Sequence, residues 1–138
     1  ALAAALLADG IDVRVAWGPG EEGLVRAVEE AARRPGLALP PTSIAELAEV
    51  LRQARLVAGN DSGTLHLAAL VGTPVVGLYG STDPTTNAPF GPGHACVVAP
   101  FPEGGSRRGR LELMLRIGVE EVRAAVLHRL RATLPPPA

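Results

Sequence analysis

The chain has 138 residues, which is the length of one ordinary domain with one hydrophobic core. Hydrophobic residues make up 47% of the chain and charged residues 20%, so its composition excludes an intrinsically disordered protein. The formal net charge of -1 gives no electrostatic reason to expect nucleic acid as a partner. All 13 basic residues are arginines, which excludes a Schiff-base lysine and a P-loop lysine within this chain.

Cys96 is the only cysteine, which excludes a disulfide framework and a multi-cysteine metal site within the chain. A lone cysteine fits a reducing compartment, so we expect a cytoplasmic protein. The apolar opening stops at Asp9, which is too short to span a bilayer, and it lacks the basic leader of a signal peptide. Because the chain begins inside a helix-like run without Met, we expect its amino-terminus to be a cut end.

The first third of the chain alternates helical and extended patterns. Residues 1–8 are typical of the end of a helix, which Asp9 and Gly10 terminate. Residues 11–16 predict a strand, and residues 21–34 carry apolar side chains at helical spacing. A short strand is possible over residues 37–39.

The next helix is marked by its start signal. Thr42 or Ser43 is expected to cap it, and Glu46 stands three residues after Ser43, which is the spacing of a capping box. The helical pattern then continues to about Ala54. The sequence therefore predicts a helix between these limits.

The remaining elements repeat the same alternation. Short apolar runs predict strands over residues 55–58, 74–79 and 95–98, and a helix is expected over residues 64–71. Glycine and proline are frequent in residues 80–93, which predicts a long loop.

The carboxyl-terminal part contains a second loop and a helix. Residues 100–110 are rich in glycine and arginine, and Arg107, Arg108 and Arg110 are candidates for contact with an anion. A last helix is expected from about Val119 to Leu134, before a proline tail.

Short apolar strands that alternate with helices favour parallel pairing through right-handed crossovers. We therefore predict one Rossmann-like α/β domain over residues 1–138, with a parallel sheet and helices on both faces. Ligands bind at the carboxyl ends of the strands in such sheets, which selects the loops 17–22, 59–64 and 80–92. Three of the four aromatic residues fall on this rim, where a flat ligand can stack: Trp17, Tyr79 and Phe90.

The loop from Gly59 to Thr64 has the strongest chemical signal. Glycine at both ends of this loop lets the backbone turn sharply and approach a ligand. Ser62, Gly63 and Thr64 place backbone amides at a helix start, which suits a phosphate or diphosphate. Asp61 repels phosphate, so we expect it to point toward neutral hydroxyls, such as those of a sugar. The alternative is a helix capped by Asp61 or Ser62 with no ligand.

Two further side chains can join this loop. His66 lies in the first helical turn, and its imidazole leans back toward the loop. The alternative is a packed histidine bonded to a backbone carbonyl, and no second histidine at ligand spacing supports a metal site. Thr82 follows the strand over residues 74–79 and can meet a phosphate, whereas Asp83 and Pro84 are equally typical of a plain turn.

The loop 17–20 leads into two acidic residues, Glu21 and Glu22. Carboxylates in a first helical turn usually interact with the helix dipole. In a nucleotide site, a carboxylate just past a strand end can instead hold the ribose hydroxyls. Both interpretations remain open for this pair.

The loop at Gly59 opens a longer motif. Residues 59–84 read GNDSGTLHLAALVGTPVVGLYGSTDP, which resembles the signature of the ADP-heptose:lipopolysaccharide heptosyltransferases, glycosyltransferase family 9. The positions that match the signature are Asp61, Ser62, Gly63, His66, Leu67, Ala68, Ala69, Gly72, Pro74, Gly80, Thr82 and Pro84. The run is long and ungapped, and weaker similarity extends over most of the chain.

The resemblance implies the GT-B arrangement, in which two Rossmann-like domains face each other across a cleft. This chain resembles the carboxyl-terminal, donor-binding domain, so residues 1–138 would lack the amino-terminal acceptor domain. In this family Ser62, Gly63 and Thr64 would hold the diphosphate, Asp61 would contact the donor sugar or its phosphate, and His66 would shape the loop. Glu22, with Glu21 as the competing choice, would meet the ribose near Trp17 and Gly18.

The resemblance also implies what the chain lacks. The catalytic carboxylate of this family lies in the amino-terminal domain, so we expect no catalytic residue here. We expect an ADP-sugar as substrate, with no cofactor and no metal, and a lipid-linked saccharide acceptor bound through the missing domain. The full-length enzyme would be cytoplasmic, with peripheral association at the inner face of the inner membrane as an option. The chain alone should bind ADP weakly and transfer no sugar.

Two rival functions fit parts of the sequence. Gly59, Asp61 and Gly63 match the spacing of an α/β-hydrolase nucleophile elbow, with Asp61 as nucleophile. Asp83 and either His94 or His128 would then complete the triad. The other rival is a non-catalytic nucleotide-sugar binding module, or half of an epimerase built on the same two-domain plan.

Overall fold

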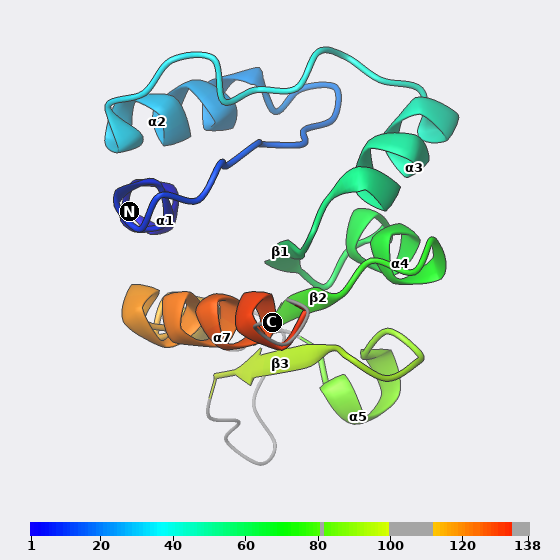
Figure 1. The fold of residues 1–138 in the computed structure, drawn as a ribbon. Helices are drawn as coiled ribbons and strands as arrows, with labels where there is room; N and C mark the ends of the chain where they lie inside the picture. Colours follow the sequence, from blue (N-terminus) through cyan, green and yellow to red (C-terminus); the bar gives the residue numbers. More distant parts are fainter. Residues whose placement is uncertain (81, 100–111, 134–138) are drawn as a thin grey trace, which may run out of the picture. The chain divides into compact units, whose positions relative to one another are not determined.

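The computed structural model describes residues 1–80, 82–99 and 112–133. The chain divides into two compact units, Ala1–Leu47 and Ala48–Ala138 (Figure 1). The arginines proposed for anion contact, Arg107, Arg108 and Arg110, lie outside the described residues.

The first unit contains two helices, α1 (Leu2–Ala8) and α2 (Glu22–Ala32). Leu6, Val25 and Leu37 are its buried apolar side chains. The strands predicted over residues 11–16 and 37–39 are wrong as strands, because they are reduced to one parallel bridge between Val15 and Ala38. The reason is that Val15 alone makes the ladder hydrogen bonds: its N–H donates to Leu37 O at 2.8 Å, and Leu39 N donates to its carbonyl at 2.9 Å.

Helix α3 (Ile44–Gln53) spans the boundary between the two units and begins as the sequence predicts. Ser43 and Glu46 form the expected capping box. Ser43 N donates to Glu46 Oε2 at 2.7 Å, and Glu46 N donates to Ser43 Oγ at 3.3 Å. Because these hydrogen bonds satisfy backbone groups that a helix start leaves unpaired, they fix the first residue of α3.

The second unit is built on a sheet of three parallel strands, β1 (Val57–Asn60), β2 (Val75–Tyr79) and β3 (Ala95–Val98), in the order β1-β2-β3 (Figure 1). The predicted parallel pairing is therefore confirmed. β1 lies two residues further along the chain than predicted, because Gly59 and Asn60 pair with Gly77 and Leu78 instead of beginning the loop.

Helices cover both faces of the central strand. Helix α4 (Gly63–Leu70) packs on β1 and β2, and α7 (Val119–Ala132) packs on β2 and β3. Val75 and Val76 are neighbours in β2 and point to opposite faces, yet both are fully buried. This burial confirms the predicted α/β layers, with the central strand packed between helices.

The loop predicted after β2 contains a short helix, α5 (Pro84–Asn87). Asp83 caps it by accepting a hydrogen bond at Oδ1 from Thr85 N at 2.8 Å, and this backbone hydrogen bond lowers the pKa of the Asp83 carboxyl. Proline at the first helical position suits such a start. A plain loop was therefore the wrong prediction for this turn.

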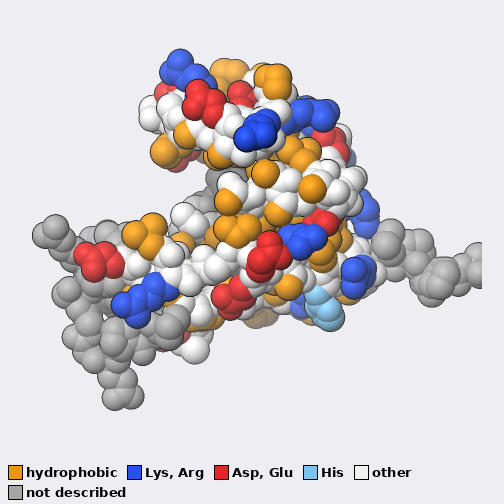
Figure 2. All heavy atoms as spheres, turned by 90° about the vertical axis from the view of Figure 1, so that its left-hand side faces the viewer, with side chains coloured by type: hydrophobic (Ala, Val, Ile, Leu, Met, Phe, Trp, Pro, Cys, Tyr) orange, Lys and Arg blue, Asp and Glu red, His pale blue; other side chains and the backbone are white. Residues whose placement is uncertain are grey.

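The surface carries charges of both signs. Figure 2 shows arginine side chains in blue among aspartate and glutamate side chains in red on one face, in keeping with the net charge of -1. No helix within the described residues is long and apolar enough to cross a membrane.

Candidate functional site

The candidate loop connects β1 to α4, and Ser62 caps the helix. The Ser62 backbone is extended, and Leu65 N donates a hydrogen bond to its Oγ at 3.4 Å. His66 N donates to the Ser62 carbonyl at 3.2 Å. Of the two caps considered from the sequence, the structure therefore selects Ser62 and leaves the Asp61 carboxylate for another partner.

Two amides at the start of α4 remain available to a ligand. Within the described part of the chain, the N–H groups of Gly63 and Thr64 have no hydrogen-bond acceptor. They stand at the end of the helix where the dipole presents roughly half a positive charge. Unpaired amides in this position form a ready site for a phosphate oxygen.

The space beside Gly63, where a side chain would stand, is open. A Cβ atom built on Gly63 would meet no atom within 4 Å, and Gly63 does not have a positive φ. The fold therefore does not itself require glycine at this position. Close approach of a ligand to the backbone is a sufficient physical reason for it.

Asp61 and His66 form a pair beside these amides. His66 Nε2 lies 3.0 Å from Asp61 Oδ1, with 16% of the Asp61 side chain and 46% of the His66 side chain exposed. A carboxylate only accepts hydrogen bonds, so Nε2 carries the proton and donates it. The imidazole reaches the loop as expected from the sequence, but its partner is a carboxylate and not a backbone carbonyl.

Two buried hydroxyls lie at the end of β2 and just beyond it. Thr82 Oγ1 and Tyr79 Oη are buried and have no hydrogen-bond partner among the described residues. Since the strands are parallel, Asp61 after β1 and Thr82 three residues after β2 both follow carboxyl ends of strands at the same edge of the sheet. An unpaired buried hydroxyl is costly, so Thr82 is a stronger candidate for ligand contact than its spacing alone suggested.

Tyr79 does not have the role expected of it. Its side chain is fully buried, and its ring lies over Gly77, so it offers no face for stacking. Burial raises the pKa of Tyr79 to about 12, with smaller contributions from Cys96 and Asp61. The sequence feature that could have predicted the buried ring of Tyr79 is Gly77, two residues earlier. A glycine there leaves room on the same face of the strand for the ring to fold back.

The predicted ribose contacts lie in the first unit. Trp17 Nε1 donates to Leu39 O at 2.6 Å, so the half-buried indole ties the two extended segments of this unit together. Glu21 Oε2 accepts a hydrogen bond from Gly18 N at 2.7 Å. In contrast, the exposed Glu22 carboxylate has no partner within the part of the chain that the structure describes. Of the two carboxylates, Glu22 is therefore the one available to a ligand.

These residues fall into two separate groups. The structure brings Asp61, Ser62, Gly63, Thr64 and His66 together at the start of α4. The other group, formed by Trp17, Gly18, Glu21 and Glu22, belongs to the first unit and is described by itself.

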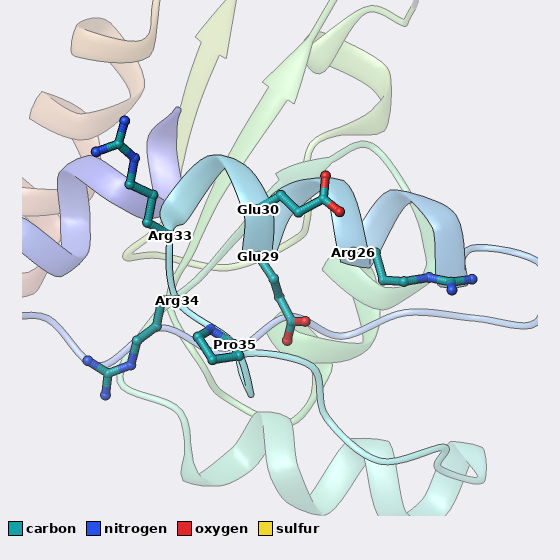
Figure 3. Close-up of a pocket in the computed structure, with 6 residues that line it drawn as sticks. All are labelled: Arg26, Glu29, Glu30, Arg33, Arg34 and Pro35. Carbon is teal, nitrogen blue, oxygen red and sulfur yellow. The ribbon is translucent and has the colours of Figure 1, made fainter.

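The first unit also has a surface hollow of about 320 Å³ along α2, lined by Arg26, Glu29, Glu30, Arg33, Arg34 and Pro35. Figure 3 shows that their charged groups diverge instead of meeting at one point. Glu29 is already occupied, since Leu37 N and Ala38 N donate to its Oε1 at 2.8 and 3.1 Å. This hollow is therefore not a competing candidate site.

The hydrolase alternative lacks its histidine. His94 Nδ1 accepts a hydrogen bond from Val75 N at 3.3 Å, which places it at the amino end of β2, opposite the end that carries Asp61. His128 precedes Arg129, whose guanidinium donates to His94 O at 2.7 Å, so it belongs to the same distant end. Asp61 therefore has no triad partner at either position. Within the described residues no group of three histidine, cysteine, aspartate or glutamate side chains could hold a metal, and the absence of a metal stays a prediction.

Comparison with known proteins gives the family. The model of glycosyltransferase family 9 (heptosyltransferase) matches residues 1–112, which is most of the chain. The chain belongs to glycosyltransferase family 9. A relative, lipopolysaccharide heptosyltransferase 1 of Salmonella typhimurium, is 33% identical over 92 residues. That match covers 66% of this chain and 29% of the relative. This chain therefore spans under a third of the relative's length.

Two solved structures share the fold. The glycosyl transferase family 9 protein of Veillonella parvula DSM 2008 has a TM-score of 0.82 at 20% identity, over 95% of this chain and 40% of that one. The E. coli heptosyltransferase WaaC with ADP has a TM-score of 0.75 at 26% identity, over 93% of this chain and 37% of that one. The predicted fold class, a Rossmann-like parallel sheet of the GT-B kind, is therefore confirmed.

Proposed function

We propose that this chain is the donor-binding part of an inverting glycosyltransferase and holds the diphosphate of a nucleotide-sugar at the amino end of α4. The observation that carries this proposal is a pair of amides, Gly63 N and Thr64 N, that have no acceptor within the described residues and lie beside the open space at Gly63. The ADP in the E. coli heptosyltransferase structure supports a nucleotide ligand for this fold. ADP-heptose is the donor that best fits the names of the relatives.

The residues around α4 have distinct roles in this proposal. The amides of Gly63 and Thr64 bind phosphate oxygens, and the hydroxyls of Ser62 and Thr64 add donors. Thr82 offers to the same group its buried hydroxyl, which has no partner among the described residues. Asp61 Oδ1 accepts the hydrogen bond from His66, which leaves Oδ2 to accept from hydroxyls of the donor sugar.

In this proposal, residues of the first unit contact the nucleoside. Glu22 accepts from the ribose hydroxyls, because its carboxylate is available while that of Glu21 is bonded to Gly18 N. Trp17 and Gly18 form the neighbouring backbone and ring surface. No metal is needed for this contact, and the phosphate charge is met by amides and the helix dipole.

In the intact enzyme, an acceptor hydroxyl attacks the anomeric carbon of the donor, the glycosidic bond to phosphate breaks, and the nucleoside diphosphate departs. The helix amides stabilise the negative charge that develops on this leaving group. The base that removes the acceptor proton comes from outside this chain. The names of the relatives support a lipopolysaccharide-type acceptor, and the cytoplasmic location expected from the lone cysteine is kept as part of the proposal.

Isothermal titration calorimetry with ADP tests the site. Gly63→Val places a branched side chain in the open space and should lower affinity at least tenfold, and Asp61→Ala should weaken binding of an ADP-sugar more than that of ADP. Gly118→Val is the matched control, because Gly118 also begins a helix and its Cβ would meet no atom within 4 Å. Unchanged ADP affinity in Gly63→Val would remove the site from α4.

Activity of the full-length enzyme separates the remaining alternatives. With an ADP-sugar and a lipopolysaccharide-type acceptor, a transferase forms a new glycosidic bond and releases ADP. A binding module releases nothing, and an epimerase changes the sugar without releasing ADP. Either of the last two results contradicts the transferase proposal.

A further inference from the structure

The Asp61 carboxylate lies beside a loop to which we assign a diphosphate, so like charges would meet there. Only 16% of the Asp61 side chain is exposed, and solvent therefore screens it poorly. The chain has no lysine, and no arginine within the described residues bonds to the loop. His66 is the basic side chain that touches Asp61.

Resting on the proposed function, we propose that His66 is a positioning residue that also compensates charge: it holds Asp61, and its average protonation increases when the diphosphate binds. Nε2 already carries the proton that it donates to Asp61 Oδ1. The incoming proton therefore adds to Nδ1, and imidazole becomes imidazolium. The proton comes from solvent, and no covalent bond to the ligand forms or breaks.

The positive end of the α4 dipole opposes an imidazolium at His66, so the negative charges of Asp61 and the incoming diphosphate have to outweigh it. Helix α4 has no other ionisable side chain, and neither has β1, so Asp61 is the charged neighbour from that side. From β2 the ionisable group is Tyr79, which is buried and stays neutral because burial raises its pKa to about 12. Histidine changes charge within the physiological pH range, so a second negative neighbour draws a proton onto it.

The test is calorimetry of ADP binding near neutral pH in Tris and in HEPES, whose ionisation enthalpies differ. The dependence of the binding enthalpy on the buffer counts the protons taken up. The chain should take up about 0.5 proton more per ADP than the His66→Gln variant. Glutamine keeps a donor toward Asp61 but cannot be protonated. ADP titrates its own phosphate equally in both proteins, so the difference isolates His66.

Affinity provides a second readout. Because protons are taken up, ADP binding to the chain should weaken about threefold between pH 7 and 8, and His66→Gln should show a smaller change. His128→Gln is the matched control, since His128 is exposed on α7 and its loss should leave proton uptake unchanged. Equal uptake in the chain and in His66→Gln overturns the inference while ADP binding, and so the proposed function, still stands.

A direct measurement covers the case in which His66→Gln does not bind. Imidazole ¹⁵N shifts of His66 in the unaltered chain should move toward those of imidazolium on addition of ADP at constant pH. Unchanged shifts with ADP bound contradict the inference. Failure of the unaltered chain to bind ADP contradicts the proposed function as well.

Discussion

Gly63 and Gly77 illustrate two physical reasons for glycine at single positions. A Cβ on Gly63 would point into open space, whereas a Cβ on Gly77 would lie 2.6 Å from Tyr79 Cε2 and 2.8 Å from its Oη. The Tyr79 ring is fully buried and has no room to move away. Gly77 therefore serves packing, and Gly63 is free to serve a ligand.

This difference predicts opposite mutational profiles. Gly77→Ala should lower the free energy of unfolding by about 1–3 kcal/mol, because it overpacks the core. Gly63→Ala should change it by no more than about 0.5 kcal/mol, because no neighbour has to shift. Urea denaturation measures both changes. A destabilisation by Gly63→Ala as large as that by Gly77→Ala would assign Gly63 to the fold instead of to a ligand.

Substitutions of Glu21 and Glu22 should have different effects on stability and on ADP affinity. Glu21→Ala removes the acceptor of Gly18 N and should lower stability by about 0.5–1 kcal/mol. Glu22→Ala should leave stability nearly unchanged but lower ADP affinity roughly tenfold, because the ribose hydroxyls lose their acceptor. Thermal unfolding and calorimetry on the same two variants measure both effects. The assignment of the ribose contact fails if Glu22→Ala binds ADP normally and Glu21→Ala does not.

The sequence predicted residues that act through local geometry and missed those that depend on packing. Ser62 and Gly63 were predictable because a cap and a helix start are set by neighbouring residues. The reach of His66 followed from the backward lean of helical side chains. The burial of Tyr79 was not predictable, because it depends on α4 and on a neighbouring strand.

At the level of elements, α3 contains an acidic residue, Glu49, whose pKa is strongly lowered in the folded chain. Hydrogen bonds from Arg52, then from Gln53, lower the pKa of Glu49 from 4.5 to about 2. Because the pKa is lowered in the folded chain, the ionised carboxylate stabilises α3 above pH 4.5, and this contribution is lost as the pH falls toward 2. Glu49 is thus an exposed but specifically bonded residue.

Thermal unfolding as a function of pH tests this behaviour. The Glu49→Gln variant should have a lower Tm than the unaltered chain above pH 4.5, and the difference should vanish as the pH approaches about 2. Glu120→Gln provides a comparison in another helix, since its carboxylate meets Arg123 in an exposed pair. A difference in Tm that does not change with pH would show that the Glu49 charge is not involved.

Elements were predicted well where the hydrophobic pattern agreed with the capping and turn residues at their ends. α3 and α4 begin at their expected caps, and β3 has its predicted limits. Residues 11–16 share the alternating pattern of a strand, but a pattern does not show whether a partner segment is long enough to pair with it. Helix α5 was missed because a single turn has too few residues for a helical period.

At the scale of the whole molecule, the chain corresponds to only part of the length of its relatives. It spans 29% of a curated heptosyltransferase relative and 37% of the E. coli structure with ADP. Its 138 residues match the length of one domain, but they form two compact units, one of which has few buried apolar side chains. Length and composition limited the size of the hydrophobic core, but they did not predict that the chain divides into two compact units.

Removal of metal is a further test at this scale. Amides and the dipole of α4 supply the positive potential in our account, so EDTA should leave ADP affinity unchanged within about twofold. Calorimetry with EDTA and with added Mg²⁺ makes this comparison. A tenfold loss of affinity on chelation would show that a metal carries the phosphate charge.

The most direct test of the central claim is an amide NMR titration of the ¹⁵N-labelled chain with ADP. The claim is that the diphosphate binds the unpaired amides at the start of α4. We predict that the largest saturable shifts occur at Gly63 and Thr64, while amides near the start of α7, such as Val119, do not move. Saturable shifts that leave Gly63 and Thr64 unmoved, or no shifts at millimolar ADP, would contradict it.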